Sequence, residues 1–150
     1  MRPTSFRGGD VADGLVQLAE ATLTDVRVID GPAPNKPSEK QILLVGWAPF
    51  IDRHMVARRR DEDIVGRMVE EGEIACYIAV GHGDTTIEPM RERAVEILTE
   101  LEDAIRAAVA KDLGADEVSV GPNSTMTQHQ DRNEGASVGL AFTVTYVAYI

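Results

Sequence analysis

Apolar side chains recur at every second position along the C-terminal segment, residues 137–150. The strongly apolar set is Val138, Leu140, Phe142, Val144, Tyr146, Ala148 and Ile150. Successive side chains of a β-strand point to opposite faces of its sheet, so this period predicts a long strand with one buried face. The same period predicts a strand over residues 73–81, with one apolar face formed by Ile74, Cys76, Ile78 and Val80.

Two other segments carry apolar residues at spacings of three and four, which is the period of an amphipathic α-helix. The first is expected to begin at Asp10, a residue type that caps helices, and to continue to about Thr22. The second spans residues 86–111, and Gly114 is expected to end it. Its apolar positions are Met90, Ala94, Ile97, Leu98, Leu101, Ala104, Ile105 and Ala108.

Shorter apolar runs predict the remaining strands. Residues 26–29 and 41–47 are separated by a proline-rich loop, and the second run is apolar at four consecutive positions. Such a run is typical of a central strand that neighbours cover. Residues 64–69 form a further candidate strand, and a tight turn or a bulge is expected after it, at Glu71 and Gly72.

Two long polar segments are interpreted as connections. Residues 48–63 contain an arginine run that three acidic residues follow, which indicates a solvated or subunit-pairing loop, with phosphate binding as the alternative. Residues 121–134 follow a short strand that begins at Val118, and they are long for a connection inside a compact domain. We expect them to extend as a hairpin arm that contacts a neighbour through Thr125, Thr127, Gln128, His129 and Gln130.

Composition restricts the class of protein. The chain has 150 residues, of which 43% are hydrophobic and 27% charged, which is typical of one domain with a single core. Its net charge of −10 disfavours binding to nucleic acid or to an anionic membrane. The single cysteine cannot form an internal disulfide, and residues 1–10 contain no apolar signal-peptide segment. We therefore expect a soluble protein that folds in a reducing cytoplasm.

Gly81 and Gly83 lie between a predicted strand and the second predicted helix, where many phosphate-binding loops occur. A dinucleotide-binding motif requires a third glycine where Thr86 stands, and a P-loop requires a lysine that this segment lacks. Thr85 and Glu88 have instead the spacing of a capping box. We therefore interpret the segment as the start of a helix.

No other motif indicates catalysis. His54, His82 and His129 are far apart in the sequence and have no cysteine partner at zinc-site spacing, so no metal or cofactor is predicted. Cys76 alternates with apolar residues and is interpreted as a small core residue. The chain is therefore predicted not to be an enzyme. A small cytoplasmic enzyme that uses His82 and Asp84 at a helix N-terminus remains the alternative.

Six pieces of the sequence follow one another from about Gly14 to the C-terminus. They read GLVQLAEATL, VRVIDGP, ILLVGW, EEGEIACYIAV, GDTTIEPMRERAVEILTELEDAIR and GLAFTVTYVAYI. In their order and spacing they resemble the tail terminator proteins of long-tailed bacteriophages, and the resemblance covers nearly the whole chain. The proline-rich loop and the arginine run lie outside it.

This resemblance implies a structural role without enzymatic activity. Such proteins form a hexameric ring on the finished tail tube, at the head-proximal end of the tail. The ring stops polymerisation of the major tail protein, offers a surface to the head-completion protein, and lets DNA pass only as cargo. Assembly in the host cytoplasm would place the chain in the virion. Another head–tail connector or neck component is the alternative.

The resemblance also implies the arrangement of the elements. The apolar patterns by themselves indicate an α+β fold, and the resemblance implies a twisted, largely antiparallel or mixed sheet with two helices packed on one face. Residues 1–9 are expected to be flexible and residues 10–150 to form a single domain. In the core, the second helix should pack on the C-terminal strand through Leu98, Leu101 and Ile105 against Leu140, Phe142 and Val144.

Opposite charges are predicted to meet across the interface between subunits of such a ring. The basic group is Arg53, Arg58, Arg59 and Arg60, and the acidic group is Glu70, Glu71 and Glu73. Replacing residues 58–60 with serine is then expected to weaken the ring and leave the fold intact. A negative lumen would repel the phosphates of the passing DNA.

Overall fold

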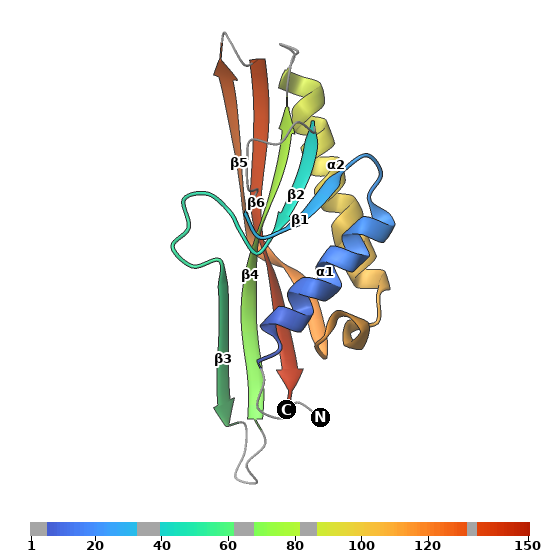
Figure 1. Cartoon of the computed structure of the whole chain (residues 1–150), viewed down its shortest axis with the longest axis vertical. Helices are drawn as coiled ribbons and strands as arrows, with labels where there is room; N and C mark the ends of the chain where they lie inside the picture. The colour runs from blue at the N-terminus through green and yellow to red at the C-terminus, as the bar shows by residue number, and fades with distance from the viewer. Residues whose placement is uncertain (1–5, 33–39, 62–67, 82–86, 132–134) are drawn as a thin grey trace.

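The computed structural model describes residues 6–32, 40–61, 68–81, 87–131 and 135–150. Its elements follow the order α1 (Gly8–Thr22), β1 (Arg27–Asp30), β2 (Gln41–Val45), β3 (Met55–Asp61), β4 (Met68–Gly81), α2 (Ile87–Ala107), the 3₁₀ helix η1 (Ala110–Leu113), β5 (Glu117–Asp131) and β6 (Gly135–Tyr149). The strands form one six-stranded sheet (Figure 1).

The sheet is mixed and largely antiparallel, which confirms the expected fold class. Its strand order is β1-β2-β4-β6-β5, and only the β1–β2 pair is parallel. The long strand β4 binds two partners along one edge. β2 pairs with the half of β4 that ends at Gly81, while β3 pairs with the half that begins at Met68. The loop between β2 and β3 therefore lies beside the middle of β4 (Figure 1).

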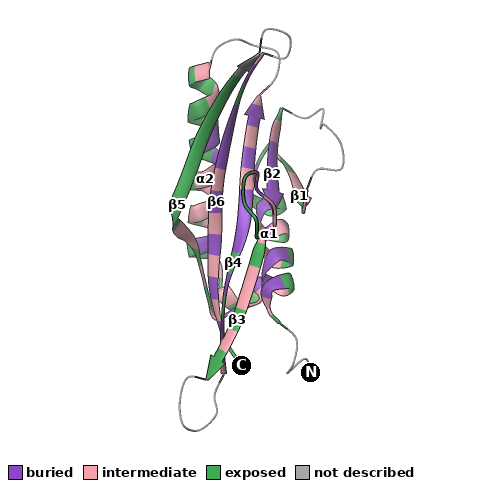
Figure 2. Ribbon diagram, turned by 90° about the vertical axis from the view of Figure 1, so that its left-hand side faces the viewer, coloured by how far each residue is buried: buried purple, intermediate pink, exposed green. Residues whose placement is uncertain are grey.

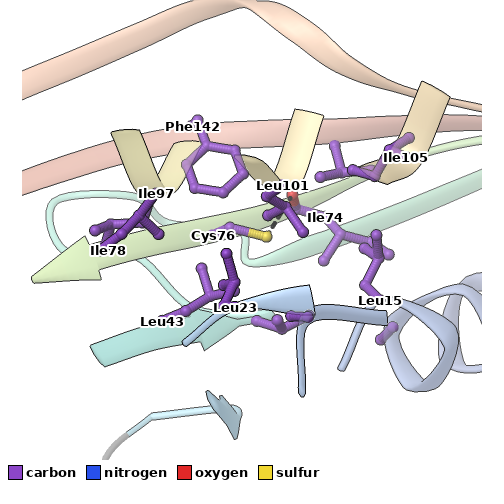
Figure 3. Close-up of a cluster of buried hydrophobic side chains, with 14 of the residues drawn as sticks. Leu15, Leu23, Leu43, Ile74, Cys76, Ile78, Ile97, Leu101, Ile105 and Phe142 are labelled. Atoms are coloured by element: carbon purple, nitrogen blue, oxygen red, sulfur yellow. Dashed lines mark hydrogen bonds between the residues drawn. The ribbon is translucent and has the colours of Figure 1, made fainter. Parts of the chain in front are cut away.

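Both helices pack on the same face of the sheet, as expected (Figure 1). The predicted apolar faces of β4 and β6 meet them, and the alternating residues from Val138 to Ala148 are all buried. On α2, Leu101 is only 2% exposed and packs in the same core as Phe142 and Ile74 (Figure 3). The predicted packing of the long helix on the C-terminal strand is confirmed.

Several predicted element ends were wrong. Helix α1 begins at Gly8, so Gly8 and Gly9 belong to the helix, and Asp10 lies in its first turn instead of capping it. Residues 1–5, the rest of the expected flexible terminus, lie outside the described residues. Helix α2 ends at Ala107, and Gly114 caps η1 with a left-handed φ of 86°.

No turn or bulge interrupts β4 at Glu71 and Gly72, which are paired with neighbouring strands on both sides. The glycine is present for a different reason. A Cβ atom at Gly72 would lie 2.2 Å from the ring of Tyr146, so the buried tyrosine requires a glycine opposite it. Tyr77 lies over Gly139 in the same way on the other face of the sheet.

The two polar segments predicted as connections are mainly strands. The arginine run lies on β3, which pairs with β4. Residues 121–131 continue β5, which pairs with β6. A bulge interrupts this pairing between Val120 and Ser124. These edge strands show no strong apolar alternation because most of their side chains are exposed, as Figure 2 shows for β5. Residues 121–131, expected to belong to a hairpin arm, form one strand that pairs with β6 in the same chain, and their contact with a neighbour stays a prediction.

Candidate functional site

The two helices leave the other face of the sheet without a helical layer, and we call it the open face (Figure 1). A hollow of about 500 Å³ lies on it over β3, β4 and β6. Four residues that the sequence predicted for an interface line this hollow: Arg53, Arg58, Glu71 and Glu73. The structure thus gathers basic and acidic candidates on one surface of one chain.

The predicted charge pairs form within the chain. Arg59 binds Glu70 with 3.0 Å between Nε and Oε1, and Arg60 binds Glu71 with 2.9 Å between Nη2 and Oε1. Antiparallel pairing of β3 with β4 sets both contacts, because it places each arginine near its glutamate on the neighbouring strand. Arg59 with Glu70 and Arg60 with Glu71 therefore pair without a second copy, and a contact of these residues across a subunit interface stays a prediction.

Glu70 is fully buried, with 0% of its surface exposed, and three donors satisfy its carboxylate. Its Oε2 accepts hydrogen bonds from the backbone N–H of Arg7 at 2.6 Å and from the hydroxyl of Tyr146 at 2.8 Å. Its Oε1 accepts the bond from Arg59, whose guanidinium lies 4.4 Å from the ring centre of Phe6. This cluster joins the start of α1 to the sheet, so its role is structural.

The cluster changes the expected effect of the arginine replacements. Burial raises the pKa of the Tyr146 hydroxyl, and its hydrogen bond to Glu70 raises this pKa further. The tyrosine therefore remains a donor to the carboxylate. Because Arg59 provides the opposite charge, replacing residues 58–60 with serine would leave Glu70 buried without that partner. The fold is not expected to remain intact in that variant, contrary to the prediction from sequence.

The predicted hairpin residues divide between the two faces of β5. Thr125, Thr127 and His129 pair with open-face residues of β6, whereas Gln128 pairs with the helix-facing residue Val138. Among the described strands, β5 pairs only with β6, so its other edge carries backbone groups without a strand partner. Edge strands of this kind are templates for pairing with another chain. The fifth candidate, Gln130, pairs through its backbone with Ala136.

Residues 46–54 form a loop that protrudes on the open-face side (Figure 1), and it carries an exposed residue that was not among the sequence-predicted candidates. Phe50 lies on this loop with 99% of its surface exposed and a φ of 63°. A non-glycine residue with a left-handed φ is uncommon and costs of order 1–3 kcal/mol. The available signal was a group of apolar residues, Trp47 to Ile51, inside a segment that is otherwise polar.

The base of this loop is held firmly. The Trp47 ring stacks on His54 with 5.8 Å between centroids and meets Tyr77 edge-on. The backbone N–H of Ala48 donates to His54 Nδ1 at 3.3 Å, and that of Ala75 donates to the carbonyl of His54 at 2.8 Å. His54 is therefore a structural residue, and the loop presents Phe50 in a defined position.

The described residues contain no group of three or more histidine, cysteine or acidic side chains that could hold a metal ion. Cys76 is buried between the sheet and α2, as predicted (Figure 3). His82 and Asp84, the candidates for an enzymatic site, lie outside the described residues, as does Thr85 of the expected capping box.

Cys76 is expected to resist thiol reagents in the folded chain. Burial raises the pKa of its thiol from 9.0 to about 12. The thiolate is the reactive form, so its fraction at neutral pH falls roughly 1000-fold. Maleimide labelling followed by mass spectrometry should be slow in buffer and fast in denaturant. Rapid labelling of the folded chain would contradict this burial. Above pH 9.0 the thiol should ionise first in the unfolded chain, which favours unfolding.

Compared with known proteins, the chain matches no family model and no curated sequence. Among the described helices, none is long and apolar enough to cross a bilayer. The candidate functional surfaces of the described chain are the hollow of the open face, the edge of β5 that faces away from β6, and the loop that presents Phe50.

Proposed function

We propose that this chain is a structural subunit of a tail terminator ring in a long-tailed bacteriophage. Six copies would cap the tail tube, stop growth of the major tail protein and bind the head-completion protein. The sequence resemblance suggests this function, and the observed α+β fold agrees with the one it implies. The alternative, another head–tail connector or neck component, would bind finished tails or heads without stopping tube growth.

The observation that supports this proposal most is the fully exposed Phe50 on a firmly held loop. Strained backbone conformations cluster at functional sites, and here one coincides with a large aromatic side chain that is fully exposed to solvent. A subunit whose apolar surface is covered on assembly accounts for both features. The net charge of −10 agrees with a ring through which DNA passes without binding.

Tail-tube growth provides the test. Purified chain added to polymerising major tail protein is expected to bind one end of each tube and to stop elongation. Electron microscopy measures tube lengths, and sedimentation measures the mass of the bound assembly. The control is an unrelated protein of similar size and acidity at the same concentration.

The outcomes separate the two functions. Tubes of fixed length with a ring at one end support a terminator. Binding to finished tails or heads without any arrest of growth would favour the connector alternative. Tubes that keep growing and carry no bound chain would contradict both functions.

A further inference from the structure

A groove between α2 and β5 lies on the helix-covered side of the sheet. It is shallow and open to solvent, has a volume of about 580 Å³, and is lined by Glu88, Arg91, Glu92, Val95, Glu96 and Met126. Val95 is 49% exposed and Met126 38% exposed, so the groove has an apolar strip. Met126 reaches this side because it pairs with Leu140, whose side chain belongs to the helix-facing core.

The groove is acidic around its apolar strip. Three glutamates and one arginine line it. Arg93, the neighbouring cation on α2, already binds Glu96. An apolar group accompanied by a positive charge would therefore complement this surface best.

The loop that carries Phe50 presents an apolar residue and a cation. Phe50 is exposed, and Arg53 is an exposed cation three positions later, beside the exposed Asp52. Arg53 also lines the hollow of the open face. The loop projects on the open-face side, while the groove lies on the helix-covered side (Figure 1). One chain therefore presents the two complementary surfaces on opposite sides of its sheet.

We propose that Phe50 of one copy inserts into the α2–β5 groove of a second copy, with Arg53 near the glutamates of that groove. This inference rests on the proposed ring and names the contact that builds it. A contact between two different surfaces is head-to-tail, so every bound pair leaves one free loop and one free groove. Repetition of this contact closes a ring when the rotation between successive copies adds up to one full turn.

Burial of Phe50 in the groove of a second copy also explains why this residue is exposed and has a left-handed φ in the single chain. Aromatic anchors that fill pockets at the centre of an interface contribute most of the binding energy, and rigid anchors lose little entropy on binding. The stacking of Trp47 on His54 fixes the loop before binding. Phe50 lies on this held loop with a left-handed φ and an exposed side chain.

Cysteine cross-linking tests the contact with the apolar residues left in place. Asp52→Cys marks the loop, and Arg91→Cys marks the groove; both native residues are exposed. Cys76, the single native cysteine, is buried and should not react. With a short bismaleimide, a chain that carries both changes should form a ladder of covalent multimers. An equal mixture of the two single variants should stop at dimers, because each chain then has one reactive site.

Three comparisons decide the result. Val109→Cys, at an exposed position just after α2, replaces the groove marker as a matched control and should give only background cross-linking. Adding Phe50→Ser, or separately Val95→Glu, to the doubly marked chain should lower the yield several-fold. Circular dichroism should show unchanged folding, since both native side chains are exposed. Equal yields from the groove marker and the control marker, or no loss with Phe50→Ser, would overturn the proposal.

The same variants distinguish this contact from the proposed function. Cross-linking uses purified chain without tubes, so a clear ladder alongside unchecked tube growth would keep the contact and reject the terminator role. If Phe50→Ser still stops tube growth and the marked chain gives no ladder, the terminator role stands and the contact is rejected.

Discussion

Replacing Glu70 with alanine should lower the free energy of unfolding by about 3–5 kcal/mol, the usual cost of removing one partner from a buried ion pair. The side chain is fully buried, and its carboxylate accepts bonds from Arg59, Tyr146 and the backbone of Arg7. Alanine would leave these donors without their acceptor and would create a cavity. Equilibrium denaturation of the wild type and the variant measures the loss.

The neighbouring residue provides the control. Glu71 also binds an arginine, but the carboxylate and its partner Arg60 are both exposed. Exposed pairs contribute about 0–1 kcal/mol, so Glu71→Ala should be nearly neutral. Similar losses in the two variants would show that the Glu70 cluster is not the structural connection between α1 and the sheet that we describe.

Leu101→Ala should cost about 2–5 kcal/mol because it removes a buried side chain from the layer between α2 and the sheet. Leu101 is 2% exposed and lies among Phe142, Ile74 and Cys76 in the main core (Figure 3). The residues around it come from two paired strands, β4 and β6, so the site cannot easily collapse around the smaller side chain. Urea denaturation should show a lower midpoint with an unchanged slope.

Val95→Ala on the same helix is the matched control, measured at low protein concentration. Val95 is half exposed, and surface substitutions usually change stability by less than about 0.5 kcal/mol. A loss below about 0.5 kcal/mol for Leu101→Ala would contradict the packing of α2 on β4 and β6.

The Glu70 cluster gives the N-terminal residues a function that composition did not indicate. Phe6 covers the guanidinium of Arg59, and Arg7 donates its backbone N–H to Glu70. The start of α1 is thus connected to the centre of the β3–β4 pair. This connection holds the first helix on the same sheet that presents the Phe50 loop on its other side (Figure 1).

The sequence by itself determined the elements that bury one complete face. Clear apolar periods are present in β6, β4 and α2. They arise because every second residue of the strands, and every third or fourth residue of the helix, is buried in the core. The α+β class, the position of Cys76 and the contact of Leu101 with the C-terminal strand all follow from these periods.

Only the tertiary structure decided the identity of the edge strands and the contacts of the charged groups. β3 and most of β5 carry polar residues, and they are strands because β4 and β6 offer free hydrogen-bonding edges. The β3–β4 register then places Arg59 beside Glu70, eleven positions later in the sequence. Likewise, the exposure of Phe50 depends on how the loop is held above the sheet. Local periodicity cannot determine pairing, register or loop direction, since these depend on residues that are distant along the chain.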